Sequence, residues 1–255
     1  MSTQHYIITG ATSGLGYEIT KQLYQHNIYL TLIVRDVEKA ERLFPKLDYP
    51  NITWIACDMT SADDIIALSD QFSMQGKRYH GLIHSAGLGY FKSITNHTHT
   101  EMIQTYQVNT LHFVLLLKQL KPYLTHDATI VGISSQAAMA TQPHGAHYAA
   151  SKAAFNHILN ALRFEEPSYH ILNVMTGPIA TPFHIHADPT GQYQQKMSRI
   201  MLQPQPLAAK IIQAMYQKKQ EFYAPKWMAG ALRIYQLAPR LFEKLGKTFF
   251  MSKMQ

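Results

Sequence analysis

Tyr148 and Lys152 are spaced by one helical turn, and Ser135 precedes the tyrosine by thirteen residues. A phenol is a weak acid–base catalyst at neutral pH, because its unperturbed pKa is roughly 10. An ammonium about 5 Å away, at an effective dielectric near 20, favours the phenolate by roughly 3 kcal/mol, or about two pKa units. The three residues therefore predict proton exchange with a substrate oxygen near physiological pH.

The Tyr-x-x-x-Lys spacing also occurs at Tyr17 and Lys21. Tyr17 follows a glycine-rich turn and has no upstream serine, so we expect it to be structural. Around Tyr148 the context is richer, because the apolar segment 128–135 predicts a buried strand that ends at Ser135. Ligands of open α/β sheets bind at the carboxyl ends of the strands.

A second motif lies at the amino terminus. Residues 5–9 form an apolar run with β-branched residues, which predicts a strand. The turn Gly10-Ala-Thr-Ser-Gly14-Leu-Gly16 follows at once, and then a helical pattern begins. Glycines let the backbone approach a pyrophosphate, and a helix N-terminus offers free N–H groups. In this strand–helix context we favour dinucleotide binding over a purely structural turn.

Strand and helix patterns alternate along the chain. This alternation predicts an α/β fold with a Rossmann-like, doubly wound parallel sheet covered by helices on both faces. We expect one cofactor-binding and catalytic domain over residues 1–225 and a basic helical tail over 226–255 that packs on it. The longest helical pattern spans about 98–124. Strand candidates lie near residues 4–9, 28–34, 51–57, 80–85, 127–134, 169–175 and 221–224.

Composition supports one globular domain, since 46% of the 255 residues are hydrophobic. No apolar run approaches the length of about 18 residues that a spanning helix needs. The first predicted strand begins within five residues of Met1, so we expect no signal peptide and a cytoplasmic location. The single cysteine, Cys57, ends a predicted buried strand, and we expect a small core residue rather than a reactive thiol.

Taken in order, these motifs resemble those of the short-chain dehydrogenase/reductase superfamily, in its single-domain branch, over about residues 3–224. The resemblance implies an NAD(P)-dependent oxidoreductase that interconverts a carbonyl and an alcohol, often as a homodimer or homotetramer. The motifs are Thr9-Gly10-x-x-x-Gly14-x-Gly16, Asp58, Ala86-Gly87, Asn109, Ser135, Tyr148, Lys152 and Gly177-Pro178-Ile179-x-Thr181.

The resemblance also implies roles for these residues. Tyr148 would be the general acid/base, Ser135 would donate to the substrate oxygen, and Lys152 would hold the nicotinamide ribose. Asn109 would kink its helix and support a water path to Lys152; by itself it could equally be a helix residue that is satisfied locally. The residues implied to bind the cofactor are Gly10, Thr12, Ser13, Gly14, Leu15, Gly16, Arg35, Asp58, Met59, Ala86, Gly87, Tyr148, Lys152, Ile179 and Thr181.

The choice of cofactor depends on the end of the second predicted strand. NAD binding usually uses an acid there, about 20 residues after the glycine turn. By the family pattern this position is Val34, which cannot accept a hydrogen bond, and Arg35 follows. A guanidinium suits the 2′-phosphate of NADP. We therefore favour NADP, although Asp36 leaves room for NAD and Arg35 could be an ordinary solvated side chain.

Two positions depart from the family pattern. His84-Ser85 stands before Ala86-Gly87 where the family usually has two asparagines, which weakens the expectation that this turn braces the sheet as usual. Thr176 replaces the customary proline before Gly177, which could loosen the turn that leads to Thr181. Neither departure removes a residue of the proton-transfer set.

The substrate is poorly specified by the sequence. We expect the segment from about 182 to 204 to cover the pocket, and Met201, Leu202 and the aromatic tail suggest an apolar small molecule. His144 and His147 flank the catalytic tyrosine and could line the pocket. His184 and His186 lack a nearby third ligand, so we expect no metal site.

The tail, residues 226–255, carries six basic residues and one acid, Glu243, so it supplies +5 of the net charge of +7. Pro239 should divide it into two helices. A basic amphipathic segment can lie on an anionic membrane surface. The alternative, which we favour here, is that the tail covers the pocket or forms an oligomer interface.

For the whole protein, a non-catalytic NADP-binding regulator or membrane-associated scaffold remains the rival function. No nucleic-acid reading module is evident in the sequence.

Overall fold

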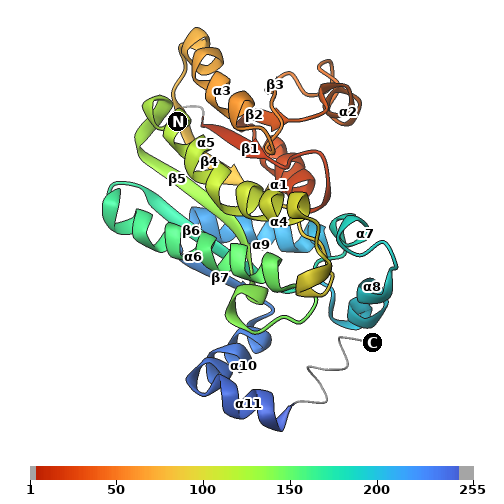
Figure 1. The fold of residues 1–255 in the computed structure, drawn as a ribbon. Helices are drawn as coiled ribbons and strands as arrows, with labels where there is room; N and C mark the ends of the chain where they lie inside the picture. The colour runs from red at the N-terminus through yellow and green to blue at the C-terminus, as the bar shows by residue number, and fades with distance from the viewer. Residues whose placement is uncertain (1–3, 247–255) are drawn as a thin grey trace.

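The computed structural model describes residues 4–246, and they form a seven-stranded sheet in the order β3-β2-β1-β4-β5-β6-β7. Every neighbouring pair of strands is parallel. Helices cover both faces, as Figure 1 shows, so the predicted Rossmann-like architecture is confirmed. The strands are β1 (His5–Thr9), β2 (Tyr29–Val34), β3 (Ile52–Ala56), β4 (Tyr79–His84), β5 (Leu124–Ser135), β6 (His170–Thr176) and β7 (Glu221–Ala224).

The order of the strands reverses between β1 and β4. From β1 the chain continues outward to β2 and β3, and then returns to pair β4 with the other side of β1. Ligands of doubly wound sheets bind at such a reversal, beyond the carboxyl ends of the strands. The glycine turn after β1 and the Ala86-Gly87 turn after β4 both leave the sheet at this place.

Helices form a layer on each face. Strand residues alternate between the layers, so that Ile7 and Ile8 of β1 enter opposite cores. Burying such a side chain contributes about 1.5–3 kcal/mol. One core is closed by α1 (Gly14–Gln25), α2 (Val37–Leu43) and α9 (Pro204–Tyr216). The other is closed by α3 (Ala62–Gln75), α5 (His112–Leu120) and α6 (Ala146–Glu165), with α4 (His99–Tyr106) packed against α6.

The long helical segment predicted over 98–124 is not uniform. It begins at a capping box, in which Thr98 and Glu101 satisfy each other's backbone N–H groups. After α4 the backbone widens into a π-helical turn over Gln107–Leu111, continues as α5 and ends in a 3₁₀ turn over Lys121–Tyr123. A π turn within a helix often marks a functional position. Here it contains Asn109, in agreement with the kink that the resemblance implied.

The segment after β6 leaves the sheet and returns to it. It contains two short helices, α7 (Phe183–Ala187) and α8 (Gln192–Met197). Its two ends are joined by a pair of backbone hydrogen bonds, from Ala180 N to Leu202 O (2.9 Å) and from Leu202 N to Pro178 O (2.8 Å). The whole segment is therefore closed at its base.

The tail forms α10 (Lys226–Leu237) and α11 (Pro239–Leu245), so Pro239 does separate two helices. The pair lies at one end of the molecule, beyond the edge strand β7 (Figure 1). The Tyr235 hydroxyl donates to Glu243 Oε1 (2.8 Å), and Thr141 donates to the same oxygen (2.6 Å). Residues 247–255 lie outside the described residues. Within 4–246, no helix is both long and apolar enough to cross a bilayer.

Candidate functional site

Four polar residues that the sequence singled out meet beyond the ends of β4 and β5. We call Asn109, Ser135, Tyr148 and Lys152 the polar framework. Ser135 is the last residue of β5, and its hydroxyl accepts from Ala137 N (3.1 Å), which fixes the side chain at the strand end. Its hydroxyl also hydrogen-bonds Tyr148, an interaction that lowers the pKa of the phenol.

Lys152 is buried, and its ammonium donates to the Ile133 carbonyl of β5 (2.9 Å). Burial lowers the pKa of this lysine to about 8. A Cβ added to Gly87 would lie 3.3 Å from Lys152 Nζ and 3.2 Å from Asn109 Oδ1. The Ala86-Gly87 turn, the π turn and α6 therefore converge at one point.

Asn109 is satisfied by residues from two other segments rather than locally. Its Nδ2 donates to the Leu88 carbonyl (2.7 Å) and to Ser151 Oγ (2.9 Å). Its Oδ1 accepts from Leu88 N (2.9 Å). The side chain thus ties the loop after β4 to helix α6, a contact that the sequence did not reveal.

The direction of the pKa shift at Tyr148 differs from that expected from the lysine alone. Desolvation by burial raises the pKa of the phenol, and only the hydrogen bond with Ser135 opposes this change. The Lys152 ammonium instead donates to the Ile133 carbonyl. Burial removes the ring from water, which disfavours the phenolate. The protein therefore keeps Tyr148 protonated at neutral pH.

The glycine turn has the close approaches that a phosphate cradle requires. A Cβ on Gly16 would lie 2.2 Å from the Gly10 carbonyl oxygen, and one on Gly10, where φ is +69°, would lie 2.7 Å from Ala86 N. Ser13 precedes α1 but makes no side-chain cap, and the first turn holds no acid. The N–H groups of this turn are therefore available to an anion, as the predicted dinucleotide requires. Thr12 is partly buried within the turn, and Leu15 belongs to the core.

The loop after β6 returns to the same turn. A Cβ on Gly14, where φ is +52°, would lie 3.0 Å from Thr181 Cβ, so Thr181 sits directly over the glycine turn. Ile179 pairs with Leu202 in the bridge that closes the segment at its base. These two expected cofactor residues therefore lie next to the cradle.

The remaining expected cofactor residues lie along the ends of β2 and β3. Arg35 is exposed, whereas Asp36 accepts from Lys39 N (2.8 Å) as the N-cap of α2. Asp58 accepts from Thr60 N (2.8 Å) and Thr60 Oγ1 (2.9 Å). Met59 is buried, and its carbonyl accepts from His112 Nδ1 (2.7 Å). Asp58 thus stabilises its own turn.

The turn after β4 is braced in a way that the sequence did not predict. Ala86 N donates to Thr9 Oγ1 (3.2 Å), and Thr9 Oγ1 contacts His84 Nδ1 (3.0 Å). Thr9 and His84 therefore link β1 to β4 in place of the expected asparagines. His84 is fully buried, and desolvation, reinforced by the Lys152 charge, lowers its pKa to about 3. The imidazole is neutral at physiological pH.

Aromatic side chains pack against the ring of Tyr148. We call Phe91, Phe183, His184 and Tyr193 the aromatic wall. The Tyr148 ring centroid lies 5.5 Å from that of Phe183 and 6.1 Å from that of Phe91. Tyr193 packs on Phe91 (4.6 Å) and on His184 (5.1 Å). The wall forms an apolar surface next to the phenol. The sequence did not predict this surface; its one local signal is that Tyr90-Phe91 directly follows a glycine-rich turn.

Other residues expected near the substrate have different positions. The His147 ring faces Tyr106 and His97, with centroids 5.9 and 4.7 Å away. Leu202 packs against the core beside β6 and pairs with Ile179, so it does not extend the wall. His184 is buried within the wall. Within the described residues, no three His, Cys, Asp or Glu side chains gather to hold a metal.

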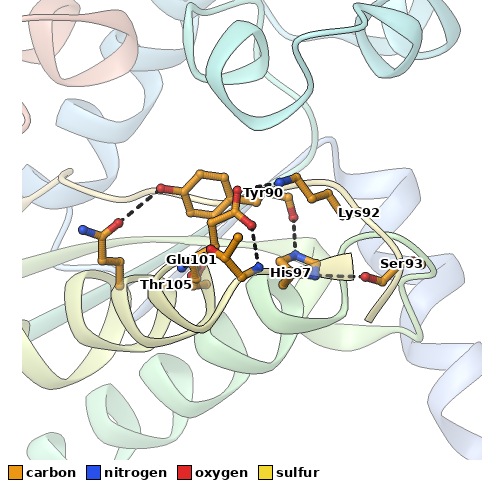
Figure 2. Close-up of polar contacts among 8 residues, drawn as sticks. Tyr90, Lys92, Ser93, His97, Glu101 and Thr105 are labelled. Carbon is orange, nitrogen blue, oxygen red and sulfur yellow. Dashed lines mark hydrogen bonds and ion pairs between the residues drawn. The ribbon is translucent and has the colours of Figure 1, made fainter. Parts of the chain in front are cut away.

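A network of polar contacts holds the loop that carries Phe91 (Figure 2). His97 Nε2 lies 3.1 Å from the Tyr90 carbonyl oxygen, and Lys92 Nζ donates to Glu101 Oε1 (2.5 Å). The Tyr90 hydroxyl donates to Gln104 (3.3 Å). Phe91 N in turn donates to the Ala187 carbonyl (2.7 Å), which joins this loop to α7. The wall is therefore anchored on α4 and on the segment after β6.

Comparison with known proteins agrees with this geometry. The family model for short chain dehydrogenase matches residues 4–190. The chain belongs to the short-chain dehydrogenase family. Members of this family are oxidoreductases with a Rossmann-like, NAD(P)-binding fold, and the predicted family is thereby confirmed.

Individual relatives are distant. An 11-beta-hydroxysteroid dehydrogenase 1A of Arabidopsis thaliana is 26% identical over 93% of this chain and 72% of its own length. An NADPH-dependent 1-acyldihydroxyacetone phosphate reductase of Saccharomyces cerevisiae is 26% identical over 69% of this chain, a match that spans 61% of the yeast protein.

Solved structures show the same fold. A short-chain dehydrogenase/reductase from Burkholderia phymatum in complex with NAD has a TM-score of 0.83, at 17% identity, with 94% of this chain and 95% of that protein covered. A short-chain dehydrogenase from Sphingobium yanoikuyae in complex with NADPH has a TM-score of 0.77, at 20% identity, with 93% and 96% covered.

Proposed function

We propose that this protein is an NADP-dependent oxidoreductase that interconverts a carbonyl and an alcohol, with Tyr148 as the general acid/base. The observation that carries the proposal is the hydrogen bond between Ser135 and Tyr148, because the Phe183 ring packs beside the same phenol. Lys152 is buried one helical turn further along α6. The glycine cradle lies at the neighbouring strand end.

The residues present fit a dinucleotide. The close approaches at Gly10 and Gly16 leave backbone exposed to a pyrophosphate, and the uncapped start of α1 adds N–H donors. Thr181 would hold the carboxamide, Lys152 the ribose and Asp58 the adenine. When bound, the nicotinamide supplies the hydride in reduction and accepts it in oxidation.

The protein's own residues would handle the proton. Because burial raises the pKa of Tyr148, the phenol carries its proton at neutral pH and can donate it to a carbonyl oxygen as negative charge develops there. The Ser135 hydroxyl would donate a hydrogen bond to the same oxygen, which stabilises that charge. The Lys152 ammonium adds positive potential and stabilises the phenolate that remains.

Asn109 would act by positioning. Its amide holds the Leu88 backbone at both its N–H and its carbonyl, so it fixes the loop that passes in front of Lys152. The π turn also changes the hydrogen bonding of its own helix, which supports the water path that the resemblance implies. Loss of this amide should displace the loop and slow the return of the proton to Tyr148.

A preference for NADP is supported by the neighbouring residues Arg35 and Asp36, of which only the arginine is free to meet a cofactor. Asp36 is engaged as the cap of α2, whereas Arg35 is exposed. Val34 cannot accept a hydrogen bond from a ribose hydroxyl, and Ser13 is exposed on the glycine turn. A guanidinium matches a phosphate dianion, and a charge-assisted hydrogen bond contributes about 1.5–3 kcal/mol. The yeast relative is named as NADPH-dependent.

We expect Arg35→Ala to raise the dissociation constant for NADPH by at least about tenfold and to leave that for NADH unchanged. Arg42→Ala, which removes another exposed arginine from α2, is the matched control and should change neither constant. Fluorescence titration with both cofactors measures the effect. Tighter binding of NADH by the unaltered protein would contradict the preference.

The substrate is proposed to be an apolar small molecule, because rings rather than charges face Tyr148. One relative is named as a hydroxysteroid dehydrogenase, in keeping with this choice, whereas the substrate in the yeast relative's name combines an acyl chain with a phosphate. A homodimer or homotetramer in the cytoplasm is proposed from the family resemblance.

The decisive experiment removes the hydroxyl group of Tyr148. Tyr148→Phe should lower turnover by about 10²- to 10⁴-fold while NADPH still binds, because only proton transfer is lost. Tyr17→Phe, at the other Tyr-x-x-x-Lys pair, should retain full activity, since Tyr17 packs against the core. Absorbance of NADPH with a panel of ketones and aldehydes measures both. An undiminished rate in Tyr148→Phe would remove this residue from the mechanism, and an inert unaltered protein that still binds NADPH would favour the regulatory alternative.

A further inference from the structure

The two tail helices leave large apolar side chains in contact with solvent. In α10, Trp227 is 63% exposed, Ile234 58% and Leu237 84%. In α11, Leu241 is 55% exposed and Leu245 76%. We call these five residues the tail face. The two consecutive helices thus expose five large apolar side chains, and exposed apolar residues that gather on a soluble domain mark contact surfaces.

The apolar residues of α10 share one side of the helix. At 100° per residue, Trp227, Ile234 and Leu237 fall within about 80° of arc. The opposite side is the packed one, where Ala229 is buried against the body of the protein. In α10, the apolar residues of the tail face therefore lie on the side exposed to solvent, while another side of the same helix packs against the domain.

Positive charge flanks this apolar side. Lys226 and Arg233 lie next to it in α10, and Arg240 and Lys244 in α11. Within residues 4–246, Lys226 and Lys244 form no ion pair. The only acid in the described tail, Glu243, accepts from Thr141, Tyr235 and Arg240 and is occupied by these contacts. An apolar strip bordered by unpaired lysines complements a surface of anionic headgroups above hydrocarbon.

The tail is also fixed to the catalytic domain. Gln136, the residue after Ser135, donates through Nε2 to the Pro225 carbonyl at the start of α10 (3.1 Å). Thr141, in the same loop, is bound to Tyr235 and Glu243. A surface that held the tail face would therefore hold the whole domain in one orientation.

We propose that the tail face and its flanking lysines bind the surface of an anionic lipid bilayer, as a peripheral contact. The apolar side chains enter the boundary between headgroups and acyl chains, and the lysines remain at the level of the headgroups. This inference is independent of the reaction proposed for Tyr148, because it requires no turnover.

Vesicle sedimentation of the full chain tests the proposal. The protein should bind vesicles of phosphatidylcholine mixed with phosphatidylglycerol more tightly than vesicles of phosphatidylcholine alone. Leu237→Glu should weaken binding at least about tenfold, because it places a charge in the apolar strip. Met74→Glu, at a residue that is 82% exposed on α3, is the matched control and should bind like the unaltered protein.

A second variant separates the role of charge. Lys226→Gln combined with Lys244→Gln should weaken binding to anionic vesicles about tenfold or more and leave binding to phosphatidylcholine vesicles unchanged. Both variants should keep the melting temperature and the NADPH affinity of the unaltered protein, which shows that they fold.

Three outcomes would overturn the proposal. One is that the unaltered protein does not bind anionic vesicles. Another is that Leu237→Glu and Met74→Glu bind equally well. The third is that Leu237→Glu halves the mass measured by equilibrium sedimentation without lipid, which would assign the tail face to a second copy of this chain.

Discussion

The polar framework, which includes Tyr148, and the aromatic wall that packs against the Tyr148 ring are built differently. Each member of the framework is tied to backbone or to a neighbouring polar group by a hydrogen bond, as Lys152 is to Ile133 and Asn109 to Leu88. The wall is held by ring contacts, and its residues come from a loop and two short helices. The end of β5, the π turn and α6 hold the framework, whereas segments that leave the sheet form the wall beside it.

This difference determines how substitutions should act. Hydrogen bonds have narrow geometry, so a small change in the framework or in its turn should be costly. Ring contacts are non-directional by comparison and contribute about 0.5–1.5 kcal/mol each beyond burial. Changes in the wall should therefore alter which substrates bind more than whether the reaction occurs.

The largest effect is expected at the glycine turn beneath the framework. Gly16→Ala places a Cβ 2.2 Å from the Gly10 carbonyl, where backbone must move, so we expect more than about 3 kcal/mol of lost stability and no NADPH binding. Gly76→Ala is the control, because that Cβ meets nothing within 4 Å and only its φ of +57° is strained. It should cost about 1–2 kcal/mol. Equal melting curves for the two variants would show that the turn is not tightly packed.

The next effect concerns His84, the buried brace behind the framework. Its pKa falls from an ordinary value of 6.5 to about 3, so between these values the unfolded chain binds a proton that the folded protein does not. Stability from this group is therefore intact above pH 6.5 and is lost as pH falls toward 3, by about 1.4 kcal/mol per pH unit.

His84→Asn removes the titrating group and restores an amide of the kind the family usually has there. We expect the variant to lose less stability between pH 6.5 and 4.5 than the unaltered protein, by about 2–3 kcal/mol. Urea denaturation across this range measures the difference. Parallel pH profiles would show that His84 is not the group responsible.

The smallest effect is expected in the wall. Phe91→Ala should raise KM for a bulky aromatic ketone about tenfold, because its ring contacts with Tyr148 and Tyr193 are lost, while kcat for a small aliphatic aldehyde changes little. Phe164→Ala, at a residue that is 87% exposed on α6, should leave both constants unchanged. A collapse of kcat for the small aldehyde would mean that the wall positions the phenol and is part of the catalytic machinery.

The sequence predicted the sheet and the framework because both depend on local signals. Apolar runs located β1 to β7 within a few residues, and the spacing of Ser135, Tyr148 and Lys152 follows from one strand and one helix. The raised pKa of Tyr148 was not predicted, since burial depends on side chains that arrive from elsewhere. His84 was noticed only as a departure, because its pairing with Thr9 joins residues 75 positions apart.

The wall escaped prediction for a related reason. Phe91 and Tyr193 are far apart in the chain and meet only because Phe91 N binds the Ala187 carbonyl and the segment folds back. No periodic pattern connects them, and His184 attracted attention as a metal ligand instead of as an aromatic ring.

The paired backbone hydrogen bonds between residues 178–180 and Leu202 have one more consequence. They fix the distance between the two ends of the stretch, so the part that follows Thr181 can vary in length and composition without moving either end. Thr181 itself has to stay, because it lies over the glycine turn. New substrate ranges could therefore arise by insertion or deletion after Thr181, and an engineer could replace the segment between Thr181 and Leu202.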